Sequence, residues 1–151
     1  TEGLVGSEMC IRDRNKLKDI LHINGEPKKN VLCHIRLTDF YHTDTERIQA
    51  ARKRLSVLVD ETEFISSDDK LIFDDDICQS IIRDQNLIHL YTNGFSAEKV
   101  FRLMSEYKTI ESNNSTLAFW AAVLNNSELI VNDMNLKKLF LLLKNTQCLS
   151  K

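Results

Sequence analysis

Proline and glycine are scarce in this chain, which has one proline and four glycines among its 151 residues. Unfolded segments and flexible linkers are usually richer in both residues. Apolar residues make up 42% of the sequence and charged residues 28%, which is ordinary for a globular protein. We therefore expect a chain that folds around a hydrophobic core.

A long hydrophobic stretch is also missing. The longest apolar run spans only residues 117–124, and the run at 139–143 is shorter still, whereas a helix that crosses a bilayer needs about 20 such residues. Apart from Cys10, the cysteines Cys33, Cys78 and Cys148 are odd in number and widely separated, so a disulfide framework is not expected. Free thiols are typical of reducing compartments. We predict no membrane partner and a cytoplasmic, intracellular location.

A strong charge imbalance and known catalytic motifs are absent as well. The formal net charge is −2, which provides no general attraction for polyanions. The sequence contains no G-x-S-x-G motif, phosphate-binding glycine loop, EF-hand loop or paired zinc-ligand spacing. The acidic residues of the segment 60–76 fit a structural role, because carboxylates are stabilising at the start of a helix and are common in polar turns. We expect no cofactor and no metal, and a non-catalytic role is favoured over an enzyme.

The first fourteen residues differ in kind from the rest. Residues 1–14 resemble translated sequencing adapter rather than a natural amino terminus, and such segments are set aside before a fold is inferred. The remaining residues 15–151 have the usual size of one domain. We predict a single helical domain there, and leave open that it is a fragment of a longer protein.

Apolar residues recur at helical spacing along most of the chain. The clearest amphipathic pattern lies at residues 46–59, where an apolar face is flanked by basic residues. Similar patterns occur at 15–23, at 77–82 with 86–91 as its continuation or end, and at 96–107, 116–124 and 133–143. These patterns predict a mainly α domain of about six helices. The residues expected in its core are Phe101, Phe119, Trp120 and Leu139.

Three short segments favour β structure instead. Residues 31–37 alternate between apolar and polar positions, and residues 63–65 and 71–73 flank a polar loop. An isolated hairpin is only marginally stable. We therefore expect a small β-hairpin or a three-stranded element at 31–37, 63–65 and 71–73, supported by the helices.

Two surfaces are candidates for contact with another macromolecule. The first is basic and lies on the helix at 46–59, with the residues Arg47, Arg52, Lys53 and Arg54. The second is apolar and lies on the last helix, with the residues Leu136, Leu139, Phe140 and Leu143. The favoured function is a non-catalytic interaction or scaffold domain that binds another protein. Nucleic-acid binding through the basic helix is the alternative, because lysine and arginine contact phosphates.

One segment also resembles two helical families. Leu90-Tyr-Thr-Asn-Gly-Phe-Ser-Ala-Glu-Lys-Val100 is similar to L-Y-x-x-G-Y-S-x-E-x-I in the helical collar of clamp-loader subunits, which implies assembly around a polymerase clamp. Asn86 to Tyr91, together with Ala97 to Met104, resembles a pentatricopeptide repeat, which implies binding of single-stranded RNA. Each resemblance covers a short segment, and neither assigns a functional residue.

Overall fold

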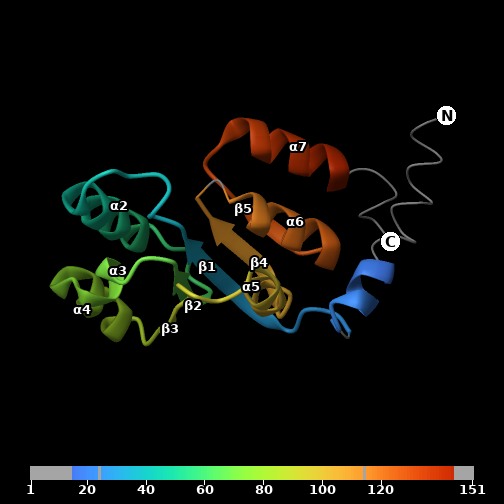
Figure 1. Cartoon of the computed structure of the whole chain (residues 1–151), viewed down its shortest axis with the longest axis horizontal. Helices are drawn as coiled ribbons and strands as arrows, with labels where there is room; N and C mark the ends of the chain where they lie inside the picture. Colours follow the sequence, from blue (N-terminus) through green and yellow to red (C-terminus); the bar gives the residue numbers. More distant parts are fainter. Residues whose placement is uncertain (1–14, 24, 114, 145–151) are drawn as a thin grey trace.

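The computed structural model describes residues 15–23, 25–113 and 115–144, and its centre is a five-stranded parallel sheet (Figure 1). The strand order is β3-β2-β1-β4-β5. The strands are β1 (Lys29–Ile35), β2 (Thr62–Ser67), β3 (Ile88–Tyr91), β4 (Tyr107–Ser112) and β5 (Glu128–Ile130). The fold is therefore α/β and Rossmann-like, and the prediction of a mainly α domain is wrong.

The errors concern short strands whose pattern is not distinctive. A run of only a few apolar residues fits a helix as well as a strand, because it is too short to show either period clearly. Residues 88–91, expected to continue or end a helix, form the edge strand β3. The expected hairpin is also wrong, because residues 63–65 lie in β2 whereas residues 71–73 lie in a helix. Strand β2 pairs in parallel with β1 and β3 instead.

The helices follow the strands in alternation along the chain. They are α2 (Asp44–Ser56), α3 (Leu71–Asp74), α4 (Asp76–Asp84), α5 (Ala97–Met104), α6 (Thr116–Asn125) and α7 (Met134–Lys144). Five of them begin at a capping side chain that accepts a hydrogen bond from the N–H three residues ahead, a common way to satisfy free amides of the first turn. These caps are Thr43, Asp75, Ser96, Ser115 and Asp133.

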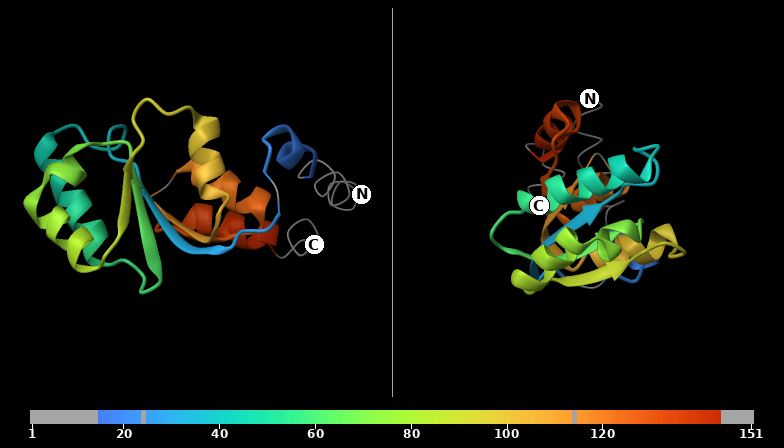
Figure 2. Two further views of the ribbon diagram at one scale, coloured as in Figure 1. Left: turned by 90° about the horizontal axis from the view of Figure 1, so that it is seen from below. Right: turned by 90° about the vertical axis from the view of Figure 1, so that its left-hand side faces the viewer.

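Helices cover the sheet on both faces, so that two apolar clusters form (Figure 2). Helices α2, α3 and α4 contact one another on one face, and α5, α6 and α7 lie on the other. Successive side chains of β1 point to opposite faces. Accordingly, Leu32 belongs to the cluster under α5 and α6, whereas Cys33 and Ile35 belong to the cluster under α2 and α4.

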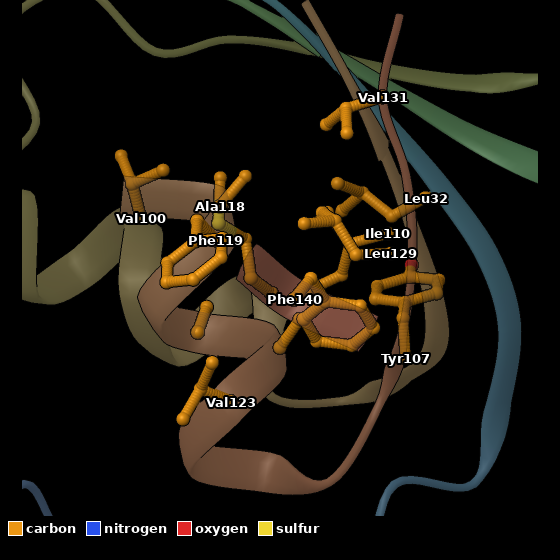
Figure 3. Packing of buried hydrophobic residues seen from close by; sticks show 13 residues of the cluster. Leu32, Val100, Tyr107, Ile110, Ala118, Phe119, Val123, Leu129, Val131 and Phe140 are labelled. Carbon is orange, nitrogen blue, oxygen red and sulfur yellow. The ribbon is translucent and has the colours of Figure 1, made fainter. Parts of the chain in front are cut away.

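Phe119 and Phe140 are central to the cluster under α6 and α7 (Figure 3). Phe119 is 2% exposed, and its ring centroid lies 6.1 Å from that of Phe140. Phe101 packs partly buried against the same cluster. Trp120 and Leu139 are instead 56% and 45% exposed. Phe119 is thus confirmed as a core residue, whereas Trp120 and Leu139 are not in the core.

Some expectations lie outside the described residues, namely the adapter-like segment 1–14 and Cys148. Cys33 and Cys78 are both buried free thiols, and burial raises the pKa of Cys33 to about 12. Across the part of the chain that the structure describes, every helix is too short or too polar to cross a bilayer.

Candidate functional site

The order of the strands creates a crevice at the carboxyl edge of the sheet. The chain leaves β1 toward α2 on one face, and it leaves the adjacent strand β4 toward α6 on the other face. Adjacent parallel strands whose connections diverge in this way form a topological switch point, where open α/β sheets bind their ligands. The loops after Ile35 and Ser112 are therefore the first place to search for a site.

The loop after β1 is held at this crevice by the neighbouring strand β4. The backbone N–H of Arg36 donates to Oδ1 of Asn113 at 2.8 Å, and Nδ2 of Asn113 donates to the carbonyl oxygen of Arg36 at 2.6 Å. The Arg36 guanidinium itself is partly exposed, pairs with Asp39 and lies 5.7 Å from the ring of Phe40. The backbone of Arg36 is thus bound while its charged group faces the surface.

Strand β2 holds the same loop from the other side. Asp68, which follows β2, accepts a hydrogen bond from the backbone N–H of Leu37 at 2.8 Å through Oδ1. Its second oxygen accepts from the hydroxyl of Thr38. Asp68 belongs to the acidic segment 60–76, and this residue of the segment therefore has a structural role, which is to bind the loop after β1 at the carboxyl edge.

His34 is a buried residue near the end of β1, next to the last residue Ile35 and immediately below the crevice. Its side chain is almost fully buried, and Nδ1 lies 2.8 Å from the hydroxyl oxygen of Ser66 on β2. On the other side, Ser112 of β4 is in register with His34. The Ser112 hydroxyl is buried and has no hydrogen-bond partner among the described residues. An unpaired buried hydroxyl is uncommon and calls for an explanation, such as a bound water or ligand.

A hollow of about 300 Å³ opens beside these residues, on the face covered by α5 and α6. It is lined by His34, Arg36, Thr38, Asp68, Thr92, Asn93, Gly94, Phe95, Ala97, Val100, Ser115 and Leu117. Gly94 has φ +88°, a conformation that side-chain-bearing residues rarely adopt. The lining residues make the wall of the hollow polar near β1 and β2, and partly aromatic at the loop that leads into α5.

The pKa of His34 provides a test of this geometry. Burial, as the largest cause, lowers the pKa of the imidazole to about 4, and the nearby Arg36 also lowers it whereas Asp68 raises it. In the unfolded chain the His34 imidazole takes up a proton near its usual pKa of about 6.5. In the folded chain the same group takes up a proton only near pH 4. Stability should therefore fall as the pH drops from 6.5 toward 4, by about 3 kcal/mol in total.

Urea unfolding at pH 7, 5.5 and 4 measures this loss. We expect His34→Gln to remove this part of the pH dependence, because glutamine does not titrate. The effect of Asp75 on stability can be distinguished from that of His34 by its pH range. Hydrogen bonds from Arg52 hold the pKa of Asp75 well below the usual range, so the stability that Asp75 contributes is lost only below about pH 4. An unchanged dependence between pH 7 and 4 in the variant would contradict the assignment to His34.

Three of the four residues of the predicted basic surface have carboxylate partners within the chain, and two of these three are Arg52 and Arg47. Arg52 forms two hydrogen bonds to Asp75, at 2.9 and 2.6 Å, which ties α2 to the start of α4. Arg47 pairs with Asp44 at 3.2 Å and lies 3.7 Å from Asp69. Both guanidinium groups therefore hold elements of this chain together.

The other two basic residues line a second, smaller hollow of about 160 Å³ on the face covered by α2. Arg54 is largely buried and pairs with the fully buried Glu111 of β4 at 3.1 Å. The Nε atom of Arg54 has no hydrogen-bond partner among the described residues. Lys53 lies at the exposed rim of the hollow. Thus Lys53 is the most exposed member of the predicted basic surface.

The predicted apolar surface of the last helix is divided between its two sides. Phe140 is buried, and Leu136 and Leu143 pack against the cluster that contains it. Leu139 is exposed, together with Leu141 and Leu142, which the prediction did not include. Of the predicted set, Leu139 is therefore the member that is exposed, and Leu141 and Leu142 add to the exposed apolar surface of this helix.

The residues at the crevice were not among the predicted site residues. His34, Arg36, Asn113 and Ser115 are polar residues placed directly at or after the ends of β1 and β4. The only signal for them in the sequence is that polar side chains follow two buried strands. No group of three or more metal-ligating side chains is found in the described ranges.

The strand order and the crevice together define a class of protein, the Rossmann-like α/β domain. Domains of this class commonly bind ligands at the carboxyl edge of the sheet. Comparisons of the chain with protein-family models, with curated proteins and with solved structures found no match.

Proposed function

We propose that this domain binds a phosphorylated small molecule of the nucleotide class at the carboxyl edge of its sheet. The observation that carries this proposal is the position of Arg36 and the start of α6 around one hollow at the switch point between β1 and β4. The other features of the site support it in turn.

The first support is the distribution of positive charge. The first amides of a helix have no partner within the helix and attract anions. At the start of α6, Ser115 caps the amide of Ala118, and the amides of Thr116 and Leu117 make no hydrogen bond to any described residue. With the Arg36 guanidinium on the same hollow, these amides suit a phosphate group.

The second support is the shape and the lining of the hollow. Its volume of about 300 Å³ is at the lower end of the range usual for small-molecule sites. Phe95 offers an aromatic surface, and Thr92 and Asn93 offer hydrogen-bonding groups. A base and a sugar need such a mixed wall, whereas an inorganic ion does not. The unpaired hydroxyl of Ser112 is a further polar group at this edge.

Calorimetric titration with four common nucleoside diphosphates and with the matching nucleosides tests the proposal. We expect Arg36→Ala to weaken diphosphate binding by about 10- to 100-fold, since hydrogen bonds to charged groups contribute about 1.5–3 kcal/mol. Nucleoside binding should change little, because Arg36 is assigned to the phosphate.

Arg83→Ala is the matched control. Arg83 is a surface arginine of α4 whose side chain is 75% exposed, and its substitution removes the same charge away from the crevice. Its affinity for the diphosphates should equal that of the wild type. Equal affinity of the wild type for nucleosides and diphosphates would contradict the proposal, as would equal losses in both variants.

A protein-interaction role is a second proposal, supported by a different observation. Trp120 on α6 and Leu139, Leu141 and Leu142 on α7 expose large apolar side chains, and helices α6 and α7 contact each other. Clustered apolar groups at a surface often mark contact with another protein. A stable monomer in light scattering would count against it. No observation favours the nucleic-acid alternative over these two proposals, because Arg47, Arg52 and Arg54 already pair with carboxylates.

A reducing, cytoplasmic setting also belongs among the proposals. It is supported by the free thiols of Cys33 and Cys78, which are buried on the face covered by α2 and α4. Buried free cysteines act as small apolar residues. Formation of a disulfide between them on mild oxidation of the folded protein would count against this interpretation.

A further inference from the structure

Asn113 makes an unusual connection across the crevice. Its amide group both accepts from the N–H of Arg36 and donates to the carbonyl of Arg36, at 2.8 and 2.6 Å. One side chain therefore satisfies both backbone groups of one residue, as a partner strand would. The connection begins where the regular pairing of β1 with β4 ends, at the pair His34 and Ser112.

The divergence of the two loops makes this connection important. After β1 the chain turns to one face, and after β4 it turns to the other. Backbone pairing cannot continue between loops that separate, so the backbone of Arg36 would otherwise lack partners on the β4 side. Asp68 binds Leu37 and Thr38 from the β2 side, and hence the loop is held from both neighbours.

We infer that Asn113 is a positioning residue, which sets the Arg36 guanidinium at the place where the phosphate of the ligand binds. This inference rests on the proposed function. Asn113 acts on the backbone of Arg36, whereas the charged group of Arg36 lies at the surface, where it pairs with Asp39 and would exchange that partner for the phosphate. A site that is ordered before binding loses less conformational entropy when the ligand arrives.

A double-mutant cycle separates positioning from a merely structural role. The variants are Asn113→Ala, Arg36→Ala and the double variant, each titrated with the nucleoside diphosphate that the wild type binds most tightly. We expect Asn113→Ala to weaken binding of the diphosphate by about tenfold, because the variant lacks the hydrogen bonds that order the backbone of Arg36 before the ligand binds. In the Arg36→Ala background the same substitution should cost nothing further, because Asn113 acts only through Arg36.

Asn132→Ala is the matched control, since Asn132 is an exposed asparagine after β5 that lines the smaller hollow. It should bind like the wild type. If Asn113→Ala does not fold, as judged by its thermal transition, Asn113→Ser replaces it in the cycle. Undiminished affinity in the Asn113 variant, or losses that add in the double variant, would overturn the inference while leaving the phosphate site intact. A wild type that binds no nucleoside diphosphate would overturn both proposals.

Discussion

Glu111→Ala is expected to lower the free energy of unfolding by about 3–5 kcal/mol, the usual cost of removing one partner of a buried ion pair. Glu111 is 1% exposed and lies on β4, an interior strand between β1 and β5. One of its oxygens pairs with Arg54 at 3.1 Å, and the other accepts from the hydroxyl of Thr62 at 3.1 Å. The substitution would leave the Arg54 guanidinium buried without its counter-charge. Urea denaturation measures the loss.

A surface pair provides the comparison for this prediction. Glu106 pairs with Lys29 at 3.1 Å, but both side chains are about half exposed. Glu106→Ala should change stability by no more than about 1 kcal/mol, because water screens the pair. We also expect the double variant Arg54→Met with Glu111→Leu to recover much of the stability, since apolar replacements often compensate a lost buried pair. A loss below 1 kcal/mol for Glu111→Ala would show that the pair is not buried as described.

The second large effect is expected at Phe119, and its neighbour Trp120 is the internal control. Phe119→Ala should cost about 3–5 kcal/mol, because it removes a buried ring and leaves a cavity. Trp120→Ala should cost less than about 1.5 kcal/mol, the range of an aromatic contact. Trp120 is 56% exposed, and its ring lies edge to face with that of Phe119, with 5.1 Å between the ring centroids. Urea denaturation of both variants checks the difference.

These two neighbours show why the prediction of the core was only partly right. The segment at 116–124 is apolar nearly throughout, so its composition predicts burial on most sides. The structure places α6 against the sheet on one side and against α5 and α7 on others, which leaves one strip exposed. Comparing the two unfolding curves therefore tests the orientation of α6. Equal losses would mean that its exposed strip lies elsewhere.

The crevice at the carboxyl edge illustrates a different limit of prediction from the sequence. Arg36 and Asn113 are separated by 77 positions in the chain, and neither belongs to a motif with a fixed spacing. They meet because β1 and β4 are paired although two strands, β2 and β3, intervene in the sequence. Only the order of the strands in the sheet brings them together.

The basic helix shows the same limit for charge. The pattern at 46–59 correctly predicts an amphipathic helix, and the structure has α2 there. It does not reveal that Arg54 faces Glu111 or that Arg52 faces Asp75. Hence most of the basic side chains that the sequence indicates as a surface for a partner form ion pairs within the chain.

The sequence by itself determined local properties: the presence of the main helices, the strand at β1, the core role of Phe119 and the absence of long apolar runs. These follow from the spacing of apolar residues along the chain, which acts over a few positions. The tertiary structure alone decided that the fold is α/β, which residues meet at the carboxyl edge and which charges are paired. Those features depend on contacts between parallel strands, and such strands are joined only through helices that carry the chain far along the sequence before it returns.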